Sequence, residues 1–150
     1  ARNPAGPASG QWMEPIDMSG TPLLTSSDYR ELVRQVVEDF ARQGEVVFLG
    51  HGAQFILRDQ PNVVRVLVTG TKKARARRVM AGMACNEEKA TEVITRTDGE
   101  RSRYFKDYFG ADWLSPSVYD LCLNTDHLNP TQATRIILAA VHAREGTAAT

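Results

Sequence analysis

The feature that most constrains this fold is the alternation of short apolar runs with longer segments of helical periodicity. Helical patterns occupy residues 25–44, 52–59, 71–84, 86–110 and 129–144. The intervening apolar runs are EVVFLG (45–50), NVVRVLVTG (62–70) and YDLCLNT (119–125). Continuous apolar runs of this length are typical of strands buried on both faces of a parallel sheet. The alternation therefore predicts an α/β fold, a parallel β-sheet with helices on both faces.

The 150 residues suit one domain with flanking segments. Residues 1–24 are rich in Pro, Gly and Ser, which predicts a disordered or extended lead. The domain is expected over 25–145, followed by a tail at 146–150. Three strands make a thin sheet, which suggests that a front part is missing. The sequence has no apolar run long enough for a membrane span, and its 18 basic and 18 acidic residues give no global field.

Ligands in open parallel sheets bind beyond the carboxyl ends of the strands. One such end carries Gly50, His51 and Gly52. Glycine lets the backbone come close to a ligand, although the same residues could simply form a tight turn. The other two ends are residues 69–71 and 124–126.

The helix predicted at 71–84 is basic. Arg75 and Arg78 are three residues apart and share a face that Lys72 extends. Three interpretations stay open: a solvated face, a phosphate contact, or a nucleic-acid surface at residues 72–78. The zero net charge and the lack of interleaved aromatic residues argue against nucleic acid as a partner.

The helix predicted at 86–110 places Arg96, Glu100 and Arg103 on one stripe. Alternating charges often form only exposed ion pairs. However, the planar fork of arginine binds phosphate in a bidentate manner, and Gly99 weakens the helix where a lid would bend. We therefore expect this segment to close over phosphate.

Neither Cys85 nor Cys122 belongs to a CxxC pair, and the three histidines lack metal-ligand spacing. We expect reduced thiols, a cytoplasmic protein and no metal ligands in this chain. The phosphate-cradling pattern GxxxxGK[ST] does not occur in the 150 residues.

Three stretches, EVVFLGHGAQFILRDQPNVVRVLV, RTDGERSRYFKDYFGADW and YDLCLNTDHL, resemble the cytidylate kinase-like family of P-loop nucleoside monophosphate kinases. The resemblance covers about residues 25–143. It implies a three-layer, P-loop NTPase-like fold whose first strand and P-loop lie before residue 1. It also implies transfer of the γ-phosphoryl group of ATP to CMP or dCMP with Mg²⁺, which groups mostly outside this chain would hold.

The resemblance also implies roles for individual residues. The GHG of residues 50–52 matches the family's GRG or GRD, whose arginine helps to hold the acceptor's phosphate, so that Gly50, His51 and Gly52 are acceptor-binding. Glu100 would position the acceptor or an arginine. The residues implied to neutralise charge on the transferring phosphoryl group are Arg96 and Arg103, and those implied to bind ATP are Arg75, Arg78, Asn124 and Thr125.

We therefore predict a cytidylate kinase-like nucleotide kinase fragment that is inactive as given. The alternatives are a non-catalytic nucleotide sensor, a nucleic-acid-binding module and a kinase with another acceptor. The sequence gives no prediction of oligomeric state.

Overall fold

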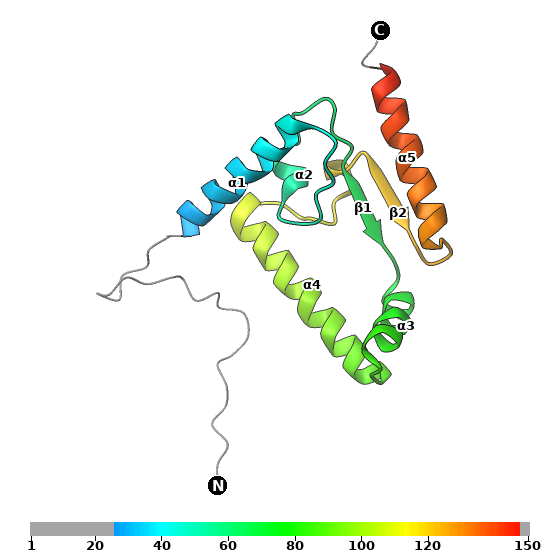
Figure 1. Cartoon of the computed structure of the whole chain (residues 1–150). Coiled ribbons are helices and arrows are strands. Elements are labelled where there is room, and N and C mark those ends of the chain that lie inside the picture. Colours follow the sequence, from blue (N-terminus) through cyan, green and yellow to red (C-terminus); the bar gives the residue numbers. More distant parts are fainter. Residues whose placement is uncertain (1–25, 148–150) are drawn as a thin grey trace, which may run out of the picture. The chain divides into compact units, whose positions relative to one another are not determined.

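The computed structural model describes residues 26–147, so the predicted lead at 1–24 and residues 148–150 lie outside it. Figure 1 shows the order of the elements along the chain. They are α1 (Ser26–Gln43), α2 (Ala53–Ile56), β1 (Val66–Thr69), α3 (Lys72–Met83), α4 (Glu87–Phe109), a 3-10 turn (Pro116–Val118), β2 (Leu121–Asn124) and α5 (Pro130–Thr147). All five predicted helices are confirmed.

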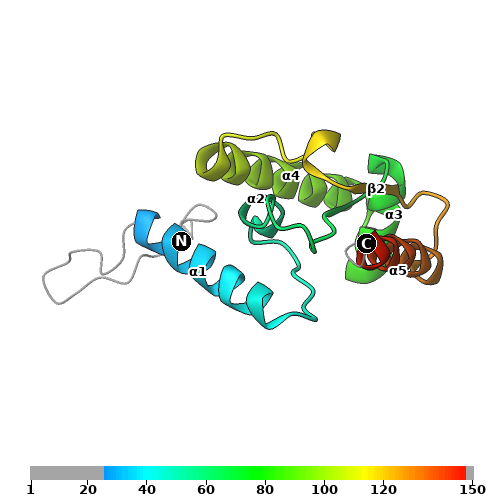
Figure 2. The ribbon, with the colours of Figure 1, turned by 90° about the horizontal axis from the view of Figure 1, so that it is seen from above.

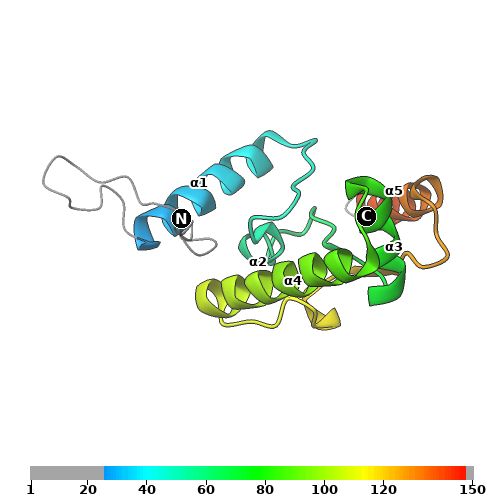
Figure 3. The ribbon, with the colours of Figure 1, turned by 90° about the horizontal axis from the view of Figure 1, so that it is seen from below.

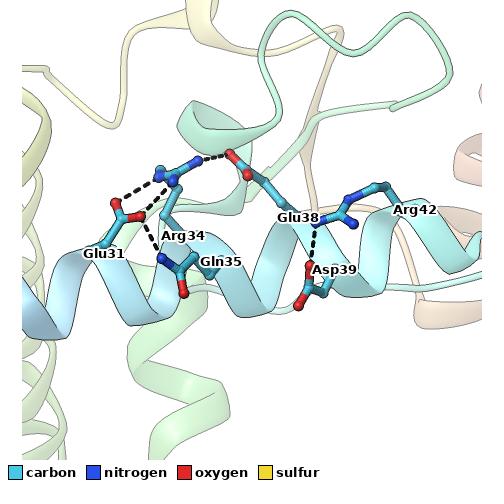
Figure 4. Close-up of polar contacts among 6 residues, drawn as sticks. All are labelled: Glu31, Arg34, Gln35, Glu38, Asp39 and Arg42. Carbon is cyan, nitrogen blue, oxygen red and sulfur yellow. Dashed lines mark hydrogen bonds and ion pairs between the residues drawn. The ribbon is translucent and has the colours of Figure 1, made fainter.

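The chain divides into two units, Ala1–Val46 and Val47–Thr150. In the first unit the structure describes α1, which carries several ion pairs along its exposed side (Figure 4). Arg34 contacts Glu31 and Glu38, each at 2.6 Å, and Arg42 pairs with Asp39. Pairs three or four residues apart on an exposed helix each add only about 0.3–0.5 kcal/mol, so they support the helix locally.

The second unit is built around a two-stranded parallel sheet. Val66 lies opposite Leu121, and Thr69 lies opposite Asn124. The parallel pairing is the predicted one, and α5 lies beside β2 (Figure 1). The observed architecture is therefore a set of helices with a small parallel sheet.

The strand predicted at 45–50 does not form, which corrects the expected three-strand sheet. These residues have no regular strand structure. Val47 and Leu49 are 94% and 93% exposed. A strand exists only through hydrogen bonds to a neighbour, and no described segment pairs with this one. The apolar composition of the run predicted a strand, but no residue among 26–147 pairs with it.

Helices α3 and α4 form a hairpin (Figures 2 and 3). Ala76, Ala90 and Ile94 are its buried core. Thr71 caps α3 by accepting from Ala74 N–H, and Asn86 caps α4 by accepting from Lys89 N–H. Small residues at the crossing let the two helices approach closely, so the hairpin is a packed arm and not two independent helices. None of the described helices combines the length and apolarity needed to cross a membrane.

Asp120 joins the start of the sheet to α5. Its carboxylate accepts from the Arg65 backbone N–H at 2.8 Å and from Arg65 Nε at 3.0 Å, and it pairs with Arg144 Nη2 at 2.8 Å. Arg144 Nη1 also donates to the carbonyl of Pro61. The hydrogen bonds from Arg65 hold the pKa of Asp120 well below its ordinary value, although partial burial acts in the opposite direction.

This network predicts acid-sensitive stability. Because the pKa of Asp120 is lowered in the folded state, its carboxylate stabilises the fold above the ordinary aspartate pKa of about 4, and this stabilisation is lost as the pH falls further. We expect Asp120→Asn to lower the free energy of unfolding at pH 7 by about 1–3 kcal/mol and to flatten its decline between about pH 5 and pH 2. Urea unfolding across that pH range measures both effects.

The matched control is Asp59→Asn, because the side chain of Asp59 is 87% exposed beside Arg58. We expect a change below about 0.5 kcal/mol there. Equal effects of the two substitutions would contradict the structural role of Asp120.

Candidate functional site

Residues 50–52 form a left-handed loop between the unpaired apolar run and α2. The φ angles of Gly50, His51 and Gly52 are 84°, 57° and 72°. A non-glycine residue in this region costs about 1–2 kcal/mol, so the conformation of His51 has to be imposed by its surroundings. Ala53 N–H donates to the carbonyl of Gly50 at 3.3 Å. The imidazole of His51 lies in the exposed part of the loop.

Gly52 lies under the ring of Phe109, the last residue of α4. A Cβ atom added at Gly52 would be 2.3 Å from Phe109 Cζ, far inside any permitted contact. Phe109 in turn stacks on Phe55, with ring centroids 4.9 Å apart. The predicted acceptor loop and the end of the predicted lid helix are thus in direct contact.

A second cluster gathers at the carboxyl ends of β1 and β2. Arg78 Nη1 donates to Thr125 Oγ1 at 2.9 Å, and Nη2 donates to the carbonyl of Thr125. Thr125 Oγ1 donates in turn to the carbonyl of Thr69 at 2.8 Å. The structure therefore brings together two of the predicted ATP-binding residues, Arg78 and Thr125.

Asp126 completes this cluster; it lies in the strand end predicted at 124–126, but the sequence analysis assigned it no role. Its Oδ1 accepts from Thr71 N–H at 2.8 Å, which is the main reason that the pKa of this carboxyl lies below its ordinary value. Its own N–H donates to Asn124 Oδ1 at 2.9 Å. The predicted residue Asn124 therefore shapes the turn after β2. A polar residue directly after a strand end was the available signal for Asp126.

Arg75 is held by a carboxylate across the hairpin. Its two terminal nitrogens donate to the two oxygens of Asp98 at 2.8 and 2.7 Å. This bidentate pair lowers the pKa of Asp98, and partial burial opposes that shift. The sequence analysis did not predict this pair between α3 and α4. In this conformation the guanidinium group of Arg75 is bound to the carboxylate of Asp98.

Arg96, Glu100 and Arg103 share one exposed face of α4. Each arginine is two residues from a buried apolar residue, Ile94 or Phe105, and two residues on a helix correspond to about 200° of rotation. The stripe therefore lies opposite the packed face. Within residues 26–147 no hydrogen bond or ion pair joins these three side chains to residues 50–52.

Gly99 does not interrupt α4, which runs unbroken from Glu87 to Phe109. A Cβ atom added at this position would meet no atom within 4 Å. A hollow of about 340 Å³ lies further along the helix, and none of the predicted site residues lines it. Its lining residues are Ser102, Lys106, Gly110, Ala111, Asp112 and Trp113. In the described part of the chain, no three His, Cys, Asp or Glu residues gather as metal ligands would.

Comparison with known proteins gives a consistent result. A family model described as the cytidylate kinase-like family matches residues 3–127. The cytidylate kinase of Pyrobaculum aerophilum is 32% identical over 115 residues, which are 76% of this chain and 61% of that protein. The cytidylate kinase of Sulfurisphaera tokodaii is 27% identical over 110 residues, 73% of this chain and 61% of that protein.

Among solved structures, an uncharacterized protein from Eubacterium ventriosum matches with a TM-score of 0.69 at 23% identity. The match covers 78% of this chain and 64% of the other, and it supports the fold alone. This chain thus spans about three fifths of the length of the curated relatives that it matches.

The free space around Gly99 generates a prediction about α4. Alanine is favoured over glycine in a helix interior by about 1 kcal/mol, so we expect Gly99→Ala to raise the free energy of unfolding by about that amount and to slow amide hydrogen exchange around residue 99. Gly82→Ala in α3, which also meets nothing within 4 Å, is the matched control and should give a similar gain. A loss of stability in Gly99→Ala alone would mean that α4 is not continuous at this position in solution.

Proposed function

The chain belongs to the cytidylate kinase-like family, and on this premise we propose that it forms the acceptor-binding and lid-bearing part of a nucleotide kinase. The complete protein would transfer phosphate from ATP to CMP, dCMP or a related acceptor. The observation that carries the proposal is the family match over residues 3–127, which includes every site residue predicted from the sequence.

We assign acceptor binding to residues 50–52 and charge neutralisation to α4. His51 is exposed and can donate one hydrogen bond to a phosphate oxygen. Arg96 and Arg103 are exposed, and Glu100 lies between them on the same face. Arginine forks that are not committed to carboxylates can bind phosphate oxygens without first breaking an ion pair.

The ATP side is assigned to Arg75, Arg78, Asn124 and Thr125. Arg78 is bound to the hydroxyl and carbonyl of Thr125, which are neutral groups, so a phosphate could add to its fork without displacing a charge. Arg75 would have to exchange the carboxylate of Asp98 for phosphate. Arg78 is therefore the better candidate for a direct contact with ATP, and Arg75 the better candidate for holding the α3–α4 hairpin.

ATP would supply the phosphoryl group, and Mg²⁺ would neutralise negative charge on the phosphates during the transfer. The exposed arginines suit the phosphates. From the family membership we propose that groups mostly outside this chain hold Mg²⁺, and that the complete fold is the three-layer P-loop NTPase-like one with its first strand and P-loop. We further propose that residues 1–150 alone do not catalyse transfer and that the complete protein is cytoplasmic.

The alternative is a nucleotide-binding regulatory protein without turnover. The observation that favours it is His51, which stands where the family pattern GRG or GRD has arginine. A neutral imidazole carries less charge and fewer donors than a guanidinium group, so acceptor binding would be weaker.

The proposal predicts binding without turnover. We expect the 150-residue chain to bind CMP and ATP with dissociation constants in the range of about 0.1–1 mM, because phosphate contacts remain while much of the site is supplied from elsewhere. Titration of the labelled protein by NMR measures binding, and a coupled assay of CDP formation measures turnover. Absence of both CMP and ATP binding would refute the assignment, and measurable CDP formation would refute the inactivity of this chain.

The loop assignment predicts a gain of affinity in His51→Arg. A guanidinium group facing phosphate in a solvated site adds about 1 kcal/mol, so we expect the dissociation constant for CMP to fall roughly fivefold. His142→Arg on α5 introduces the same charge away from the loop and controls for net charge. Equal effects of the two substitutions would show that nonspecific attraction, and not the loop, binds the nucleotide.

A further inference from the structure

We infer that Phe109 is a positioning residue that holds the 50–52 loop in the conformation in which it receives the acceptor's phosphate. The inference rests on the proposed function for the role of the loop, and on the observed contact for the role of Phe109. It gives the end of α4 a role in loop packing, in addition to the proposed role of its arginines in phosphate binding.

The contact is specific for this ring and this glycine. Phe109 Cζ and Cε2 lie 2.3 and 2.5 Å from the point where a Cβ of residue 52 would stand. Gly52 is buried, whereas Gly50 and His51 are exposed, and nothing lies within 4 Å of a Cβ at Gly50. The loop therefore has one anchored end and two residues held out in solvent.

The ring of Phe109 is itself fixed. It stacks on Phe55, with ring centroids 4.9 Å apart and an interplanar angle of 19°. The helix ends immediately afterwards at Gly110, whose N–H donates to the carbonyl of Lys106 at 3.0 Å. Because the ring is stacked on Phe55 and belongs to the end of α4, its position is fixed independently of the loop. It can therefore restrict the movement of Gly52.

The positive φ of His51 needs such resistance, whereas the glycines on either side adopt positive φ without strain. The strain at His51 favours relaxation to ordinary backbone angles unless neighbouring contacts forbid it. The available restraints are the Phe109 ring over Gly52 and the hydrogen bonds from Phe55 N–H and Ile56 N–H to the carbonyl of Gly52 at 2.8 and 3.1 Å. Those bonds start α2 after Gly52, and they do not restrain Gly50 or His51 directly. Removal of the ring would free Gly52 and, through it, the orientation of His51.

The test compares Phe109→Leu with Phe105→Leu in the full 150-residue chain. Both substitutions remove a ring from the same aromatic cluster, and Phe105 is only 5% exposed, so its loss should destabilise the protein at least as much. The readouts are the backbone amide chemical shifts of Gly50 and His51 without nucleotide, and the dissociation constant for CMP.

We expect Phe109→Leu to shift both amide resonances and to weaken CMP binding at least fivefold. Phe105→Leu should lower the melting temperature but leave the amide shifts and CMP affinity within twofold. Phe109→Met, which keeps most of the volume without the ring, replaces Phe109→Leu if that variant does not fold.

The inference is overturned if the Phe109 variant keeps both amide shifts, or if Phe105→Leu disturbs the loop equally. The proposed function fails separately. If the unmodified chain does not bind CMP, the nucleotide assignment is lost, while the amide shifts still decide whether Phe109 positions the loop.

Discussion

The parallel register of β1 and β2 is the constraint on which the second unit depends. It is fixed at both ends by polar groups: Arg65 and Asp120 join the strands where they start, and Thr69 and Thr125 join them where they end. A shift of one residue would turn the side chains of a strand to the opposite faces of the sheet and break both joints. Because α3 starts directly after β1 and the turn to α5 starts after β2, the same register brings Arg78 to Thr125. The geometry of the strand-end cluster is therefore a consequence of sheet pairing.

Local signals in the sequence predicted the local structure well. The helices at 71–84 and 86–110 and the apolar runs at β1 and β2 were predicted from patterns that act over a few neighbouring residues. The segment at 45–50 was misassigned because an apolar run becomes a strand only when a distant partner supplies hydrogen bonds. The Asp98 partner of Arg75 was missed for a related reason, since packing of α3 against α4 decides which charged groups meet. The resemblance in sequence predicted the family, which the family model confirms over residues 3–127. The roles that it implied for individual residues remain predictions.

Helix α4 has an apolar face that packs against the rest of the second unit and a charged face that is exposed. Its inward face carries Ala90, Ile94 and Phe105 and is buried along the hairpin and the aromatic cluster. Its outward face carries Arg96 and Arg103, and these residues are offset from the packed face by about half a turn. A rigid-body tilt of the α3–α4 arm could move these arginines without unpacking the helix, whereas a bend at Gly99 would break helical hydrogen bonds. The packed core of Ala76 and Ile94 therefore favours motion of the arm as one piece.

Val47 and Leu49 leave apolar surface of the second unit exposed to solvent. Two nearly fully exposed aliphatic side chains forgo about 1.5–3 kcal/mol each that burial would provide. Val68 in β1 is also exposed, at 56%, although its register partner Leu123 is buried. Two parallel strands alone are a marginal sheet in water. Within the described residues of the second unit, the small sheet therefore leaves Val47, Leu49 and Val68 without apolar cover.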